Sequence, residues 1–167
     1  MNVLEDFAQV EVFIFDVDGV LTNGQLLITE DGQLLRNMNI KDGYAMQLAV
    51  KKGYQVWVIS GAKSKGVQIR LQKLGLQEVH INIEDKQPLL QELLRKHNLD
   101  AAKVLYMGDD LPDFDCINCV FLPTCPADAA PEILERCKYV SYANGGDGCV
   151  RDVIRKVLLL QGHWPTA

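Results

Sequence analysis

The 167-residue chain lacks the features that would suit it to a nucleic acid, a membrane or secretion. Acidic residues outnumber basic ones, and the net charge of −5 argues against a nucleic-acid partner, which would favour a basic surface. No apolar run approaches the length of a transmembrane helix. The segment Met1 to Asp6 holds neither a basic region nor a long apolar stretch, so we expect no signal peptide and a cytoplasmic protein.

Cysteine is too sparse for a disulfide framework. Five thiols, an odd number, fit a reducing compartment. Cys116 and Cys119 have the spacing of a metal or redox pair, but the other three cysteines are far apart in the sequence and supply no second pair. We therefore expect buried or incidental thiols in place of a structural zinc site.

The chain is long enough for one domain with a substantial core, and we expect residues 1–167 to form it. Apolar strand-like runs alternate with helix-like segments, which predicts an α/β fold: a Rossmann-like parallel sheet flanked by helices. The runs 56–59 and 104–107 are apolar without alternation, as is typical of strands buried on both faces. The expected strands are residues 10–15, 55–60, 79–82, 104–107, 120–122 and 139–141, and the expected helices are 43–52, 64–74, 86–97, 130–137 and 150–160.

Two segments stand outside this alternation. Residues 25–29 and 33–37 flank Glu30-Asp31-Gly32, which predicts a β-hairpin with a glycine turn. The hairpin, residues 25–37, follows the first strand closely, so we expect a flap beside the active site whose leucines form a candidate oligomer surface. Residues 161–167 are expected to form a tail that is either disordered or placed over a neighbouring subunit.

Side chains suited to chemistry follow four of the predicted strands. They are Asp16 and Asp18 after the first strand, Ser60 after the second, Lys86 at the start of a helix after the third, and Asp109 with Asp110 after the fourth. The carboxyl ends of parallel strands are where open α/β sheets place their sites. The carboxylates would repel one another unless a hard divalent cation lies among them, and oxygen ligands favour Mg²⁺.

This arrangement fits phosphoryl transfer. Asp16 would attack phosphorus and form an aspartyl-phosphate. Asp18 would first protonate the leaving alkoxide and then take a proton from the attacking water. Mg²⁺ would be held by the Asp16 carboxylate, the Asp18 backbone carbonyl and Asp109, while Ser60 and Lys86 would bind the phosphoryl oxygens.

Further residues are expected to support this chemistry. Thr22 would hydrogen-bond the acidic loop, and Asp110 and Asp113 would orient the water molecules of the metal or Lys86. Candidates for substrate contact are Gly61, Asp42, Lys63 and Arg70. Asp42 is equally suited to capping a helix, and Lys63 and Arg70 to being solvated helix charges.

The motifs Asp16-Val17-Asp18-Gly19-Val20-Leu21-Thr22, Ser60, Lys86 and Gly108-Asp109-Asp110-Leu111-Pro112-Asp113 match, in this order, those of the haloacid dehalogenase-like superfamily, which the chain therefore resembles. The hairpin, Lys41-Asp42-Gly43 and the run from Gly145 to Arg151 make it more similar to the 3-deoxy-D-manno-octulosonate (KDO) 8-phosphate phosphatases. That resemblance implies a phosphatase of lipopolysaccharide precursor synthesis without a cap domain. It also implies a homotetramer in which the hairpins assemble and a neighbouring subunit helps to close each site. The intervals Asp18–Ser60 and Ser60–Lys86 leave no room for a cap.

The chain also departs from that branch. Ser60-Gly61 is followed by Ala62 and Lys63, where the branch often has a basic residue directly after the pair, and lysine cannot make the bidentate fork of arginine. A nine-carbon, sialic-acid-type 9-phosphate is therefore the alternative substrate. Two alternatives of another class are a phospho-accepting signalling domain, against which Asp18 argues, and an inactive scaffold, against which the complete set of motif positions argues.

Overall fold

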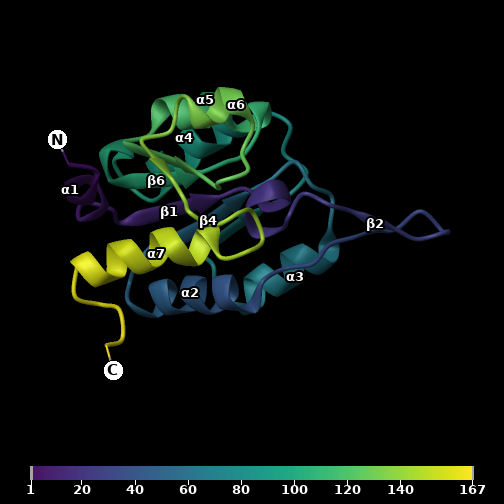
Figure 1. Ribbon diagram of the computed structural model, residues 1–167, viewed down its shortest axis with the longest axis horizontal. Helices are drawn as coiled ribbons and strands as arrows, with labels where there is room; N and C mark the ends of the chain where they lie inside the picture. Colours follow the sequence, from purple (N-terminus) through teal and green to yellow (C-terminus); the bar gives the residue numbers. More distant parts are fainter. Residues whose placement is uncertain (1, 167) are drawn as a thin grey trace.

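The computed structural model describes residues 2–166 and shows a parallel sheet between two layers of helices (Figure 1). The sheet has six strands in the order β5-β4-β1-β6-β7-β8, and every neighbouring pair is parallel. The predicted α/β class is confirmed, and residues 2–166 contain no separate cap domain. The strands are β1 (Val12–Phe15), β4 (Gln55–Ile59), β5 (Glu78–His80), β6 (Val104–Met107), β7 (Leu122–Cys125) and β8 (Tyr139–Val140). The helices are α1 (Val3–Phe7), α2 (Ile40–Lys51), α3 (Lys65–Lys73), α4 (Lys86–Lys96), α5 (Phe114–Cys119), α6 (Pro131–Leu134) and α7 (Cys149–Leu160).

The central strand β1 contributes to two apolar cores because successive side chains point to opposite faces. Phe13 and Phe15 face the core covered by α2, α3 and α7, whereas Val12 and Ile14 face the core covered by α4, α5 and α6 (Figure 1). All four side chains are fully buried. The sheet is therefore held from both sides, and its strand ends form a fixed platform for the site.

Several boundaries differ from the sequence prediction for physical reasons. Helix α2 begins three residues before the predicted Gly43, because Asn39 caps it by accepting hydrogen bonds from the amides of Lys41 and Asp42. Strand β7 lies C-terminal to the predicted run 120–122 and contains Pro123, a residue that donates no ladder hydrogen bond and argues against a strand in sequence.

The short helices were the least well predicted elements. The expected helix 130–137 is reduced to α6, and the short helices α1 and α5 were not predicted. Helix α5 contains Cys116 and Cys119, which are free thiols. Among residues 2–166, the candidate metal cluster consists of aspartates and contains no cysteine.

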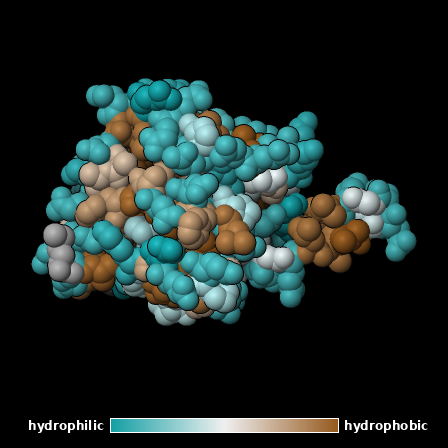
Figure 2. Space-filling view, turned by 90° about the horizontal axis from the view of Figure 1, so that it is seen from above, coloured by the Kyte–Doolittle hydropathy of each residue, from teal (hydrophilic) through white to brown (hydrophobic). Residues whose placement is uncertain are grey.

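The hairpin consists of β2 (Leu27–Ile28) and β3 (Leu34–Leu35), which pair antiparallel. The amide of Gly32 donates to the carbonyl of Thr29 and closes the turn at 2.9 Å. The hairpin extends away from the body of the molecule (Figure 1), and its apolar side chains are exposed and form a continuous cluster (Figure 2). No helix within the described part of the chain is both long and apolar enough to cross a membrane.

The C-terminal segment packs against its own chain. The Tyr54 hydroxyl lies 2.7 Å from Oε1 of Gln161 and 2.7 Å from Nδ1 of His163, and the Arg151 guanidinium lies 5.1 Å from the centre of the Trp164 ring. Tyr54 precedes β4, so its two contacts lie at the amino edge of the sheet, whereas Arg151 lies in the first turn of α7. In the single chain this segment therefore has contacts with its own body, its placement over a neighbouring subunit stays a prediction, and Ala167 lies outside the described residues.

Candidate active site

The carboxyl ends of β1, β4 and β6 lead directly to Asp16, Ser60 and Asp109, which line one cleft of about 500 Å³. Lys86, the first residue of α4, lines the same cleft. Asp16, Ser60 and Lys86 are each less than a tenth exposed. The structure thus brings together the four strand ends that the sequence predicted to meet.

The acidic loop after β1 is folded around the hydroxyl of Thr22. Thr22 Oγ1 accepts hydrogen bonds from the amides of Gly19 and Gly24, each at 3.2 Å, and the residue is fully buried. Asp16 is fixed at the start of the loop because its amide donates to the carbonyl of Met107 and its Oδ1 accepts from the amide of Val17. Both carboxylates of the Asp-x-Asp motif therefore project from a rigid turn.

Gly19 is a close-approach position within this loop. Its φ is +85°, and a Cβ atom there would lie 1.8 Å from Oδ2 of Asp109. A larger residue would meet both backbone strain and a clash with a carboxylate. The glycine of the motif is therefore what lets the carboxyl groups of the two strand ends come together.

Lys86 bridges two of the carboxylates. Its Nζ lies 3.1 Å from Oδ2 of Asp16 and 2.7 Å from Oδ1 of Asp113. Asp113 also accepts from the hydroxyl of Tyr106 at 2.7 Å and, through Oδ2, from the amide of Asp109 at 3.0 Å. Three donors thus occupy the Asp113 carboxylate, which holds Lys86 against Asp16.

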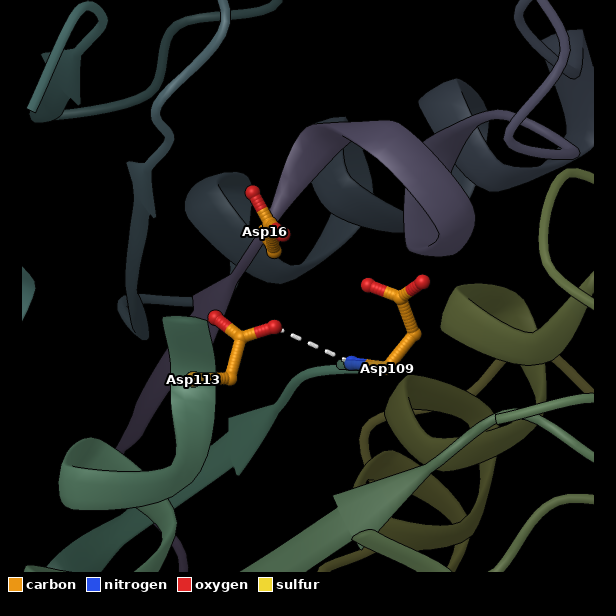
Figure 3. Close-up of side chains that lie close together, drawn as sticks. All are labelled: Asp16, Asp109 and Asp113. Atoms are coloured by element: carbon orange, nitrogen blue, oxygen red, sulfur yellow. Dashed lines mark hydrogen bonds between the residues drawn. The ribbon is translucent and has the colours of Figure 1, made fainter. Parts of the chain in front are cut away.

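The site offers a set of oxygen ligands for a cation. Carboxylate oxygens of Asp16, Asp109 and Asp113 lie within 4.8 Å of one another, and Figure 3 shows the three side chains around a common space. Because Asp113 already accepts three hydrogen bonds, Asp16 and Asp109 have the greater capacity to bind an ion. An all-oxygen, anionic site of this kind suits a hard divalent cation.

The carboxylates carry more negative charge than Lys86 neutralises. Burial, together with the nearby Asp16, Asp113 and Asp110, raises the pKa of Asp109 to about 8 against the opposing effect of Lys86. Burial and Asp113 likewise raise the pKa of Asp16 to about 7. Burial alone would lower the pKa of Lys86, but Asp16 and Asp113 outweigh it and the net shift is upward. A bound divalent cation would supply the missing positive charge.

Arg36 is a part of the site that the sequence analysis missed. From the end of β3, its Nε lies 2.7 Å from Oδ1 of Asp18 and its Nη2 lies 3.0 Å from Oδ2. The Arg36 side chain is only 4% exposed, although the hairpin strands are exposed. The available signal was an arginine at the end of the second hairpin strand, where the chain returns toward the acidic loop.

The other predicted residues fall in different places. Gly61 and Asp110 line the cleft, whereas Lys63 and Arg70 line an adjoining hollow beneath the hairpin. Asp42 is 1% exposed, and its Oδ1 accepts from the amide of Arg151 in the first turn of α7 at 2.8 Å. This burial, which raises the pKa of Asp42 to about 6, argues against the predicted contact with a sugar hydroxyl and favours the capping role, on α7 instead of α2.

Comparison with known proteins decides the family. The chain is 34% identical over 161 residues to the 3-deoxy-D-manno-octulosonate 8-phosphate phosphatase KdsC of Salmonella typhi, covering 96% of this chain and 86% of the relative. The chain belongs to the KDO 8-phosphate phosphatase family. No family model matches the sequence. The resemblance inferred from the motifs is therefore confirmed by an alignment that spans nearly the whole chain.

Solved structures of the family share the fold. The phosphatase from Yersinia pestis superimposes with a TM-score of 0.93 at 32% identity, covering 96% of this chain and 87% of that one. The enzyme from Moraxella catarrhalis, described in complex with a magnesium ion, a phosphate ion and a KDO molecule, gives a TM-score of 0.92 at 26% identity, with coverage of 96% and 92%. Each match covers 96% of this chain.

Proposed function

We propose that the protein is a Mg²⁺-dependent phosphomonoesterase that converts KDO 8-phosphate to KDO and phosphate. The observation that carries this proposal is the grouping of Asp16, Lys86 and Asp109 in one cleft at the carboxyl edge of the sheet, in a chain that belongs to this family. A signalling domain would have no use for a second carboxylate beside the first, and an inactive scaffold would not need to retain the whole grouping.

In the first half of the reaction, a carboxylate oxygen of Asp16 attacks phosphorus and the bond from phosphorus to the sugar oxygen breaks. Lys86 and Ser60 bind phosphoryl oxygens, and Lys86 holds Asp16 in place, as the 3.1 Å contact indicates. Asp18 gives a proton to the departing sugar alkoxide. The products of this half are the free sugar acid and a phosphorylated Asp16.

In the second half, Asp18 takes a proton from a water molecule whose oxygen attacks the phosphorus of the aspartyl-phosphate. The acyl phosphate bond breaks, inorganic phosphate leaves and Asp16 is restored. We assign the cation to the Asp16 carboxylate, the Asp18 backbone carbonyl and Asp109, and, when bound, Mg²⁺ offsets negative charge that develops on the phosphoryl group. Asp113 positions Lys86, and Thr22 holds the loop that carries both catalytic carboxylates.

The residues Ala62 and Lys63 are the reason to consider a second substrate. No arginine follows the Ser60-Gly61 pair, so bidentate recognition of a sugar carboxylate from that position is absent. A nine-carbon, sialic-acid-type 9-phosphate remains the second candidate. The phosphatase mechanism is the same for both substrates.

We also propose that the protein assembles as a homotetramer through its hairpins. Leu27 and Ile28 are 68% and 66% exposed, and Leu34 and Leu35 are each 44% exposed, although all four are large apolar side chains. They lie together on an arm that projects from the body (Figure 2), where a second copy of the arm offers matching apolar surface. Light scattering should report four chains, and Leu27→Asp with Ile28→Asp should yield smaller species.

A panel of sugar phosphates tests the proposed activity. Phosphate release should require Mg²⁺ and should be fastest, by orders of magnitude in kcat/KM, with KDO 8-phosphate. A preference for the nine-carbon 9-phosphates would replace the substrate and keep the chemistry. No phosphate release from any member, with or without a metal chelator, would refute the proposed function.

A further inference from the structure

The hairpin reaches into the catalytic grouping at one point, the ion pair between Arg36 and Asp18. Both carboxylate oxygens of Asp18 are engaged, one by Nε and the other by Nη2, in a bidentate geometry. Nη1 of Arg36 donates to the carbonyl of Leu34 at 3.2 Å, which ties the guanidinium to the hairpin backbone. Asp18 is the proposed proton donor and acceptor, so the pair occupies the oxygens that the reaction needs.

The pair also separates two hollows. Asp18 lines the catalytic cleft, while Arg36 lines an adjoining hollow of about 1280 Å³ between the hairpin and the start of α3. The cationic residues of this second hollow are Arg36, Lys63, Lys65 and Arg70, and none of its described lining residues is acidic. An ester with its phosphoryl group beside Lys86 and Asp16 would extend its sugar past Arg36 toward these cations. An anionic group on that sugar would then have a reason to bind there.

We propose that Arg36 is a positioning residue that exchanges partners, pairing with Asp18 in the free protein and with the carboxylate of the substrate in the complex. The exchange frees Asp18 for proton transfer only when an acidic sugar occupies the hollow. Recognition of the carboxylate is thereby coupled to completion of the catalytic grouping. This inference rests on the proposed function, because it takes Asp18 as the acid and base.

Kinetics with two substrates separate this role from a merely structural one. D-Arabinose 5-phosphate is a sugar phosphate without a carboxylate, and KDO 8-phosphate has one. In Arg36→Met we expect kcat/KM for KDO 8-phosphate to fall roughly 10- to 100-fold, the scale of a charge-assisted bidentate contact. We expect kcat/KM for arabinose 5-phosphate to rise, because Arg36 no longer holds Asp18, and an unchanged value would contradict the exchange.

Two variants serve as controls. Arg36→Lys keeps the charge without the fork, so it should recover part of the binding of the acid, seen as a smaller rise in KM. Arg155→Met removes an exposed arginine from α7 and should leave kcat/KM unchanged for both substrates. An equal loss on both substrates in Arg36→Met would show that Arg36 only holds Asp18, and no change on either would show that it has no role. Both results would overturn the proposal.

A binding measurement tests the exchange of partners by Arg36 without any catalytic turnover. In ¹⁵N-labelled wild-type protein with Mg²⁺, the Nε–H resonance of Arg36, assigned from Arg36→Lys, should shift when free KDO is added. It should not shift with the same concentration of arabinose. A resonance that stays in place at saturating KDO, or an absence of KDO binding, contradicts the exchange even if the protein hydrolyses no ester. Wild-type protein without phosphatase activity would refute the proposed function separately.

Discussion

The Asp113 carboxylate lies 2.7 Å from Nζ of Lys86, and the same Nζ lies 3.1 Å from the Asp16 carboxylate. Asp113, on a short helical turn after β6, therefore positions Lys86 of α4 against Asp16 at the end of β1. Tyr106 and the amide of Asp109 donate to the same Asp113 carboxylate. The position of the lysine is therefore set by a network that spans two strand ends.

We expect Asp113→Asn to lower kcat roughly 10- to 100-fold, the usual effect of removing a partner that orients a site residue. The amide keeps the shape of the carboxylate but loses the charge that attracts Lys86. Steady-state kinetics and Mg²⁺ titration by calorimetry measure the effect. Asp115→Asn, at an exposed position two residues later on α5, is the matched control, and an equal effect of both variants would contradict the role of Asp113.

Gly19→Ala should abolish activity, with kcat/KM reduced by more than about a thousandfold, because its Cβ would displace the Asp109 carboxylate. Gly53 has a similar φ of +93° but no atom within 4 Å of an added Cβ. Gly53→Ala should therefore cost about 1 kcal/mol of stability from backbone strain alone and keep its activity. Thermal unfolding and kinetics of both variants would separate clash from strain, and an active Gly19→Ala would disprove the close approach.

Stabilisation of the protein by Mg²⁺ should grow as the pH rises from about 6 to 9. The pKa values of Asp16 and Asp109 are raised to about 7 and about 8, so without a cation the folded state binds protons that the unfolded state has released. Stability then falls as the pH rises through these values, and a cation reverses the loss. The stabilisation is measured at each pH as the difference between the Tm with Mg²⁺ and the Tm with a chelator. A difference that is the same at every pH would argue against the assigned ligands.

The contacts of Glu78 predict a second loss of stability, at acidic pH. Burial alone would raise the pKa of Glu78, but hydrogen bonds with Lys96, His97 and His80 outweigh it and lower the pKa from 4.5 to about 2. The resulting stability is present above pH 4.5 and is lost as the pH falls toward 2. Glu78→Gln should lower the free energy of unfolding by about 1 to 2 kcal/mol at pH 7 and by much less at pH 3. Urea denaturation at pH 7 and pH 3 measures both free energies, and a loss of stability that does not depend on pH would contradict this account.

The sequence predicted the sheet and the carboxylates that line the cleft because both depend on local signals. Continuous apolar runs mark buried strands such as β6, and polar residues directly after a strand must lie at its carboxyl end. Pro123 shows where such signals mislead, because pairing on both sides of β7 overrides the missing amide donor. Strand identity was therefore clearer than strand boundaries.

Contacts between distant segments could not be predicted in the same way. The pair between Arg36 and Asp18 depends on the direction in which a hairpin folds back, and the cap that Asp42 provides joins the start of α2 to α7, 109 positions later. The hydrophobic periodicity of the sequence indicates neither of these contacts. The sequence therefore identified the carboxylates, the serine and the lysine of the cleft, whereas Arg36 and the pairing of these side chains required the fold.

Phosphate release from KDO 8-phosphate by wild-type protein and Asp16→Asn, each with Mg²⁺ and with a chelator, tests the central claim most directly. The account predicts Mg²⁺-dependent turnover by the wild type and a fall of at least about a thousandfold in the variant, which keeps the shape of the side chain but loses the nucleophile. Activity in Asp16→Asn within tenfold of the wild type, or turnover that survives the chelator, would contradict it.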